Sequence, residues 1–398
     1  MLPYIALFEY IHKQIENVIE KNITNNDVYD EYKNIVHTPQ LADQVFMEIM
    51  NNYFYEVGLK NAKLTRLKEP EQYIGVKVRA TKDTLMVTEV IDDIRFVVGD
   101  EILQLSGDPV DYCRKRYHRI LGDEPYHREE WERILTYQND VTIQRGNQQD
   151  RIELKLYPVN QRSFIDVYEK DGVPILNIVG NITFEQAVEG LYRLSHFQTT
   201  TEKVIFDFRK ARFDQLSIAE FLLPYFFEIG EQAEVDAIDT EILLENERQN
   251  ALFKQKLERL YKRTNDMNEQ AFYQNLLDQP VGKWRFFEDN KIKFIGLSRF
   301  ESIDVIIDKD TEQGAEWLVQ NMSKSQIVNI IGRPTKGYLN FFESVDEIID
   351  QRFLFTFPVA NQNTNKCDDI VYPDLLLEWT KRHVKIDLDI KFACDNSS

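Results

Sequence analysis

Residues 306–338 read IIDKDTEQGAEWLVQNMSKSQIVNIIGRPTKGY, and this stretch decides the fold of the chain. The opening apolar run predicts a buried strand, the polar residues after it a turn, GAEWLVQNM a helix, and IVNIIG a second buried strand. This alternation is typical of α/β folds, in which helices cover a sheet. Gln313 stands where the turn enters the helix. The chemistry open to the segment therefore depends on Gln313.

The same alternation extends from residue 159 to residue 398. The apolar runs PILNIVG, KVIFDFR, SIDVIID and IVNIIG alternate with predicted helices at 183–195, 217–227 and 314–322. They predict an α/β core domain over 159–398. Residues 228–280 differ, because Glu and Lys are interleaved there with leucines at helical spacing. We interpret this segment as a solvated helical hairpin inserted in the core, with a lid or an oligomer contact as the alternatives.

Two further parts precede the core. Residues 1–70 place apolar side chains such as Leu7, Ile11 and Ile15 at helical spacing, which predicts an N-terminal helical subdomain. Residues 71–158 contain short alternating runs such as VKVRA and IELKL, with a tight turn at SGDP. This part is predicted to be a β-rich module with one or two helices.

Composition limits the class of protein. The chain has 398 residues, of which 43% are hydrophobic, and 48 Lys and Arg against 67 Asp and Glu give a formal charge of -19. Such a charge repels phosphate backbones and anionic membranes, so we expect no nucleic-acid partner. A basic peptide or protein is compatible with it. No apolar run is long enough to span a bilayer, and the first 22 residues lack a basic leader region. We expect a cytoplasmic protein, or an extracytoplasmic one if a leader was removed.

Metal and cofactor signals are missing from the sequence. Cys113, Cys367 and Cys394 form no CxxC pair, and we find no HExxH, EF-hand or phosphate-binding glycine pattern. We therefore expect neither a metal nor a cofactor.

Four short motifs follow one another along the core: VIFDFR at 204–209, TEQGAEW at 311–317, GRPTKG at 332–337 and VYPD at 371–374. Together with the preceding parts they resemble the C-terminal processing, or tail-specific, serine peptidase family. The resemblance implies a ClpP/crotonase-like core and a PDZ-like module at 71–158. In such a module Tyr73, Ile74, Gly75 and Val76 would receive a peptide C-terminus by adding a strand. A β-sandwich spacer is the alternative for that module.

The resemblance also locates the catalytic positions, and each is altered. The family nucleophile opens a Ser-x-x-Glu motif at a helix N-terminus, where this chain has Gln313, Gly314, Ala315 and Glu316. A carboxamide has no hydroxyl with which to form an acyl-enzyme. Tyr338 stands at the lysine-base position of one branch, with Lys336 two residues before it, and Asn61 aligns with the histidine base of the other.

A third alteration concerns the glycine-rich oxyanion loop of the family. Here the sequence is Lys210-Ala211-Arg212-Phe213-Asp214, without glycine, so we expect bulky residues to narrow the cleft beside Gly314, Glu316 and Lys336.

These losses favour a peptidase-like protein that has lost proteolytic activity and binds a peptide or protein partner. The alternative is a divergent serine endopeptidase whose nucleophile is displaced to Thr311, Ser323 or Ser325. A third hypothesis is subunit assembly through residues 228–280, which would make the chain a homo-oligomer. His37 is the histidine nearest the altered base position in sequence, and we interpret it as structural.

Overall fold

The structure is a computed structural model, and it divides into two compact units that are described separately. It describes the residue ranges 2–16, 26–38, 41–59, 62–67, 72–121, 125–159, 162–197, 201–236, 240–243, 247–264, 267–278, 283–285, 291–337, 344–362 and 370–395. Unit 1 comprises residues 1–69, 234–294 and 337–369, and unit 2 comprises residues 70–233, 295–336 and 370–398. None of the helices in the described ranges is both long and apolar enough to cross a membrane.

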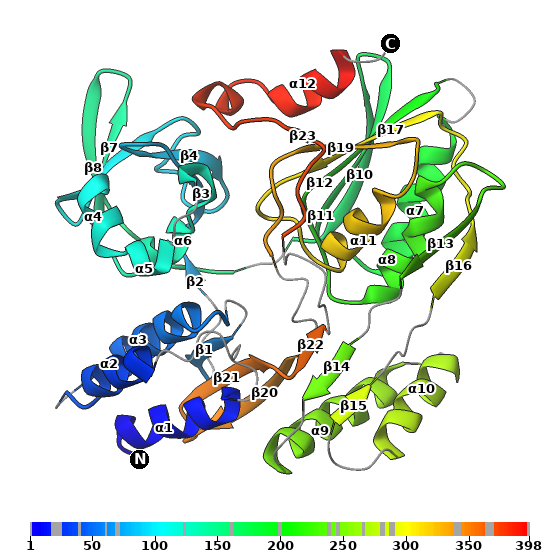
Figure 1. Cartoon of the computed structure of the whole chain (residues 1–398). Coiled ribbons are helices and arrows are strands. Elements are labelled where there is room, and N and C mark those ends of the chain that lie inside the picture. Colours follow the sequence, from blue (N-terminus) through cyan, green and yellow to red (C-terminus); the bar gives the residue numbers. More distant parts are fainter. Residues whose placement is uncertain are drawn as a thin grey trace. The chain divides into compact units, whose positions relative to one another are not determined.

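Unit 1 combines helices with small antiparallel sheets (Figure 1). Its helices are α1 (Tyr4–Ile15), α2 (Asn26–Val36), α3 (Asp43–Glu56), α9 (Glu247–Arg263) and α10 (Met267–Asp278). Its strands are β1 (Lys63–Arg66), β14 (Thr240–Leu243), β15 (Lys283–Arg285), β20 (Ser344–Ile349), β21 (Phe353–Pro358) and β22 (Ala360–Gln362). They form two sheets, of order β1-β21-β20 and β15-β14-β22. The helices α1 and α3 lie in the part of the chain where apolar spacing predicts helices, and residues 1–69 share unit 1 with residues 234–294 and 337–369.

The core of unit 1 explains why α9 differs from the expectation of a solvated hairpin. Leu252, Phe253 and Leu257 of α9 are buried in the same apolar cluster as Phe8 of α1 and Phe355 of β21. The amide of Gln249 also donates to the carbonyl of Gln14. The charged residues of the segment leave one apolar helix face, and that face packs on residues that are distant in sequence.

The first half of unit 2 is a module of short strands and helices. Its strands are β2 (Gln72–Tyr73), β3 (Val76–Ala80), β4 (Leu85–Val90), β5 (Glu101–Leu105), β6 (Asp108–Pro109), β7 (Asp140–Arg145), β8 (Gln148–Glu153) and β9 (Tyr157–Pro158). Its helices are α4 (Val110–Arg116), α5 (His118–Leu121), the 3-10 turn η2 (Tyr126–Arg128) and α6 (Trp131–Leu135). The main sheet has the order β3-β4-β5-β7-β8 and encloses a core around Trp131. We call residues 72–158 the sheet module.

The second half of unit 2 is a largely parallel sheet. Its strands are β10 (Phe164–Lys170), β11 (Val173–Asn181), β12 (Lys203–Phe213), β17 (Ser302–Ile307), β18 (Glu312–Gln313), β19 (Val328–Gly332) and β23 (Leu375–Leu376). Their order is β10-β11-β12-β17-β19-β23, and β18 pairs with the end of β12. Only the β10–β11 pair in this order is antiparallel. The strands β12, β17 and β19 are those expected from the apolar runs.

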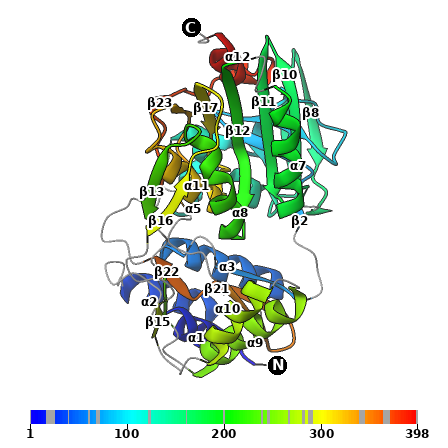
Figure 2. The same ribbon diagram turned by 90° about the vertical axis from the view of Figure 1, so that its right-hand side faces the viewer.

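Helices cover this sheet. They are α7 (Phe184–Ser195), α8 (Leu216–Leu222), the 3-10 turn η3 (Leu223–Phe226), α11 (Gly314–Met322), the 3-10 turn η4 (Lys381–Val384) and α12 (Leu388–Asp395). In Figure 2, α7 and α8 lie over one face of the strands. The helix α12 contributes Ile390 and Ala393 to a cluster with Ile175 and Ile306. Two further strands, β13 (Gln232–Asp236) and β16 (Lys291–Ile295), pair with each other.

Candidate functional site

A sharp turn between β18 and α11 forms the centre of the candidate site. Gln313 ends β18, which pairs in parallel with Arg212 and Phe213 of β12, and α11 begins at Gly314. The backbone of Gln313 has φ 58° and ψ −126°. Residues other than glycine rarely adopt such a conformation, and it persists only where the surrounding structure enforces it. The surrounding packing therefore fixes the backbone of this turn, and with it the position of the Gln313 side chain at the start of a helix.

Three contacts enforce this turn. A Cβ atom on Gly314 would lie 2.7 Å from the carbonyl oxygen of Phe213, so only glycine allows the helix to begin this close to β12. The backbone N–H of Gln313 donates to Oε2 of Glu316 at 2.9 Å, and Glu316 is fully buried. The Gln313 carboxamide oxygen accepts from Nε of Arg212 at 3.2 Å.

The chemistry of this turn follows from its apex. The N-terminus of a helix favours negative charge, which is why a nucleophile or an oxyanion gains from such a position. Gln313 offers a neutral amide, whose nitrogen is a poor nucleophile and whose oxygen already accepts from Arg212. In this arrangement the apex can bind through hydrogen bonds but supplies no hydroxyl or thiol for covalent attack.

Lys336 lies close to the same turn. Its backbone N–H donates to the carbonyl of Thr311 at 3.0 Å, and its ammonium forms an ion pair with Glu130 of the sheet module. A protonated amine has no lone pair with which to act as a base. Lys336 is thus near the expected cleft but is engaged with a carboxylate.

Charges of both signs surround the residues before Gln313. Burial works to raise the pKa of Asp310, but the charges of Lys309, Lys77 and Lys336 outweigh it and lower that pKa to about 2. Burial raises the pKa of Glu312, although Lys336 opposes the shift. A binding partner at this turn would meet a strongly polar surface.

The alternative nucleophiles have other roles. Thr311 is fully buried, and its hydroxyl donates to the carbonyl of Phe208 at 2.8 Å. The Ser323 hydroxyl donates to the carbonyl of Gln320 at the far end of α11, and the Ser325 hydroxyl accepts from the backbone N–H of Ile327. All three hydroxyls therefore make local structural hydrogen bonds.

The two expected base positions, Asn61 and Tyr338, lie outside the described residues. His37 is exposed near the end of α2 in unit 1. In unit 2, His383 lies on η4 with Nε2 at 3.3 Å from Oδ1 of Asp389, and burial lowers the pKa of His127 to about 4. Among the described residues, none of these histidines forms a hydrogen bond with Gln313.

The segment expected to narrow the cleft is a strand. Residues 210–213 continue β12, where Ala211 pairs with Gly180 of β11 and Phe213 with Gln313. The side chains of Ala211 and Phe213 are fully buried. Residues 210–213 therefore have regular strand backbone.

The four residues expected to hold a peptide terminus run from Tyr73, which ends β2, to Val76, which begins β3. Ile74 and Val76 are fully buried, and the carbonyl of Gly75 accepts from the backbone N–H groups of Ile91 and Asp92 at 3.0 Å. The hydroxyl of Tyr73 donates to Asp92. Beyond them, β3 pairs with β4, and no second strand pairs with it in the part of the chain that the structure describes.

One feature was missed from the sequence: a chain of buried ion pairs. Arg79 of β3 contacts Asp308 at the end of β17. Asp308 in turn lies 3.1 Å from Nε of Arg333, and Arg333 contacts Asp389 of α12 at 2.5 Å. The members are distant in sequence, so no spacing pattern announces them. These ion pairs link the sheet module to the parallel sheet beside the candidate site.

No arrangement of three or more His, Cys, Asp or Glu side chains that could hold a metal ion occurs within the described ranges.

Comparison with solved structures identifies the fold. Mature CPAF complexed with lactacystin has a TM-score of 0.67 to this chain at 11% sequence identity, covering 99% of this chain and 97% of that one. A second structure of mature CPAF has a TM-score of 0.66 at 12% identity, covering 100% and 98%. The photosystem II D1 C-terminal processing protease matches at 0.48 and 10% identity, covering 99% and 97%. The chain has the fold of the tail-specific proteases.

The two CPAF structures match over 99% and 100% of this chain, so the similarity of fold includes both units. No family model matches the sequence. No curated protein matches it either. The likeness is therefore one of fold, and the activity has to be argued from the residues.

Proposed function

We propose that this chain is a peptidase-like protein without proteolytic activity that binds a peptide or protein partner. One observation carries the proposal: the strained turn of the tail-specific protease fold has the amide of Gln313 where a hydroxyl is required. The backbone conformation costs about 1–3 kcal/mol for a residue other than glycine. The turn has kept this strained shape without the nucleophile it would serve, which favours retention of the scaffold for binding.

Two further changes support loss of proteolysis. The oxyanion loop is replaced by the continuous strand β12, and Lys336 is paired with Glu130. Restoring one group alone would leave the others missing. A peptidase with a displaced nucleophile is less well supported, because the hydroxyls of Thr311, Ser323 and Ser325 make structural hydrogen bonds.

Within this proposal, residues 72–158 act as a PDZ-like module and the parallel sheet as a ClpP/crotonase-like core. The support is the order of strands in the module and an outer edge of β3 that faces α6 and η2. The backbone N–H of Val78 points toward the carboxylate of Glu132 on α6, at 3.5 Å. An extended peptide would add beside β3 and take over this N–H.

The net charge of the chain favours a basic partner. Glu130 and Glu132 lie on the α6 side of β3, where Lys336 and Lys309 pair with them, so the expected preference rests on the formal charge of -19 of the whole chain. Complementary charge raises association rates and favours partners of opposite sign. We expect a basic peptide, with its carboxyl end near Tyr73, Ile74, Gly75 and Val76.

Peptide titration tests the proposal. Fluorescent peptides with the same apolar C-terminal residue and either lysine-rich or glutamate-rich bodies are titrated with the purified chain, and anisotropy is recorded at two salt concentrations. The basic peptide should bind more tightly, and salt should weaken its binding. Equal weak binding of both peptides, or no binding by either, would contradict the proposal.

A matched pair of variants locates the site. Val78→Pro removes the N–H that a peptide would use, and Val141→Pro removes a ladder N–H in the interior strand β7. If the substitutions acted only by destabilising the protein, binding by each variant would fall in proportion to its unfolded fraction. Val78→Pro should abolish binding at temperatures where circular dichroism shows the protein folded, since β3 is the edge strand.

A further inference from the structure

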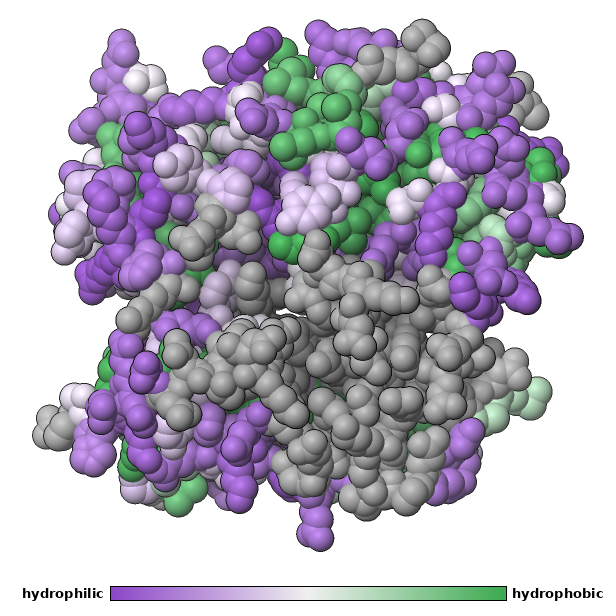
Figure 3. Space-filling view, in the orientation of Figure 1, coloured by the Kyte–Doolittle hydropathy of each residue, from purple (hydrophilic) through white to green (hydrophobic). Residues whose placement is uncertain are grey.

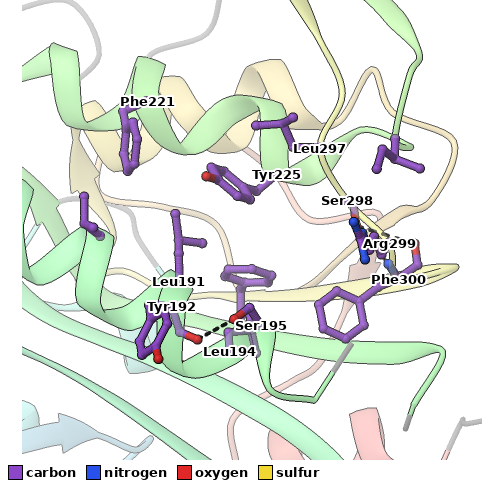
Figure 4. A pocket seen from close by; sticks show the side chains of 13 residues that line it. Leu191, Tyr192, Leu194, Ser195, Phe221, Tyr225, Leu297, Ser298, Arg299 and Phe300 are labelled. Atoms are coloured by element: carbon purple, nitrogen blue, oxygen red, sulfur yellow. Dashed lines mark hydrogen bonds between the residues drawn. The ribbon is translucent and has the colours of Figure 1, made fainter. Parts of the chain in front are cut away.

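An apolar pocket lies on the helical face of the parallel sheet, apart from the turn at Gln313. Its volume is about 390 Å³, within the range of about 300–1,000 Å³ usual for small-ligand sites. It is lined by one face of α7, by residues of α8 and η3, by Phe206 of β12, and by the turn 297–300 (Figure 4). All of these elements belong to unit 2.

The walls of this pocket are aliphatic and aromatic. Leu191 and Leu194 come from α7, Phe221 from α8 and Phe300 from the turn (Figure 4). Large apolar side chains at its rim remain exposed to solvent: Val188 by 45%, Tyr192 by 66%, Ile229 by 58% and Leu297 by 43%. Exposed apolar side chains gathered around a pocket in this way are typical of ligand-binding and interaction sites.

One cation stands at the pocket. Arg299 lines it at the end formed by Ser298 and Phe300 (Figure 4), and it is exposed. Among the described residues its guanidinium makes no ion pair or hydrogen bond. An apolar pocket with a single cation at its margin suits a ligand that has one anionic end and an apolar body.

We propose that this pocket binds a medium-chain alkyl carboxylate, with the chain against the leucines and aromatic rings and the carboxylate on Arg299. A polyanion or zwitterion would bring a second charge against apolar walls without a partner, which costs free energy. A neutral alkane would leave Arg299 unused. This site is separate from the peptide groove, so it stands or falls independently of the proposed function.

Calorimetric titration of the full chain with alkyl carboxylates tests the proposal. Hexanoate, octanoate and decanoate are compared below their micelle-forming concentrations, with 1-octanol as the uncharged control. Each buried methylene should tighten binding roughly fourfold. Octanoate should bind more tightly than 1-octanol. No heat of binding for any of the three acids, or affinity independent of chain length, would overturn the proposal.

Two variants with matched controls locate the ligand. Arg299→Gln should weaken octanoate roughly threefold to tenfold and remove the preference over 1-octanol, whereas Arg382→Gln, at another exposed arginine, should change neither. Val188→Trp should fill the pocket and abolish binding. Val45→Trp, on α3 and exposed by 43%, should not.

A second copy of the chain is the competing occupant of this face. Sedimentation of wild-type protein and Val188→Trp distinguishes it: the proposal expects the same molecular mass for both at all concentrations tested. A dimer that Val188→Trp dissociates would overturn the proposal, because the apolar face would then be covered by protein.

Discussion

Replacing Asp308 by asparagine perturbs the buried chain of ion pairs at its centre. Asp308 is 2% exposed and Arg333 1% exposed, and Arg79 on the other side has a side chain 12% exposed. Burial works to raise the pKa of Asp308, yet Arg79 and Arg333 outweigh burial and hold that pKa far below its usual range. The carboxylate is therefore charged in the folded protein and compensates two buried guanidinium groups.

The size of the effect follows from what the substitution leaves behind. Asp308→Asn keeps the volume and one acceptor oxygen but removes the negative charge from between Arg79 and Arg333. Removing one partner of a buried ion pair costs about 3–5 kcal/mol, because the remaining charge stays buried and uncompensated. We expect a loss of about 3–5 kcal/mol in the free energy of unfolding at pH 7.

Urea unfolding followed by circular dichroism measures this loss. Asp111→Asn is the control, since Asp111 pairs with Lys115 across one helix turn and both side chains are more than half exposed. Exposed pairs contribute about 0–1 kcal/mol. A second variant that also carries Arg79→Met should recover part of the stability, because it removes the cation that Asp308→Asn leaves without a carboxylate, whereas Arg333 keeps Asp389 as a partner.

Acid supplies a further check on Asp308. A carboxylate whose folded pKa is depressed stabilises the fold above its unfolded pKa of about 4, and this contribution is lost as pH falls below that value. The difference between wild type and Asp308→Asn should therefore shrink below about pH 4. A stability loss under 1 kcal/mol at pH 7, or a difference independent of pH down to 2, would refute the reasoning.

Three other predictions concern unit 2. The pKa of His127 is lowered to about 4 by burial and by Arg79, so as pH falls from about 6.5 the imidazole is protonated in the unfolded chain before it is protonated in the folded protein. The free energy of unfolding should therefore drop by up to about 3 kcal/mol by pH 4. Urea titrations should show a weaker dependence of stability on pH for His127→Gln. Gly314→Ala should destabilise the protein by about 1–3 kcal/mol, because its methyl group would lie 2.7 Å from the Phe213 carbonyl oxygen; a thermal melt unchanged from wild type would show that the turn relaxes freely. Glu132→Gln should weaken a lysine-rich peptide roughly fivefold, and anisotropy should show no such change for Glu153→Gln on β8.

The sequence predicted the strand-turn-helix segment closely. The helix expected at 314–322 is α11 (Gly314–Met322), and the one expected at 183–195 is α7, for which Thr183 is the N-cap residue. Both follow from strong apolar periodicity beside a strand. The helix α4 (Val110–Arg116) was not expected, because its seven residues are too few to show a period.

What the sequence could not predict depends on contacts between distant residues. The strained backbone of Gln313 arises from pairing with β12 and from the closeness of Gly314 to Phe213. The buried face of α9 and the link from Arg79 to Asp308 likewise need partners from elsewhere in the chain. The exposed apolar residues Leu375, Leu376 and Ile386 can likewise be identified only once the fold is known. Figure 3 shows hydrophobic residues, in green, gathered on the upper part of the face that it draws.

Catalytic turnover tests the central claim most directly. The purified chain and its Gln313→Ser variant are incubated with an unfolded fluorescent protein substrate and with a fluorophosphonate probe that labels activated serines. We expect no cleavage and no labelling of the wild type, and none above background for Gln313→Ser, because our proposal holds that the base and the oxyanion loop are altered as well. Sustained cleavage by the wild type, abolished by changing Thr311, Ser323 or Ser325, would contradict it.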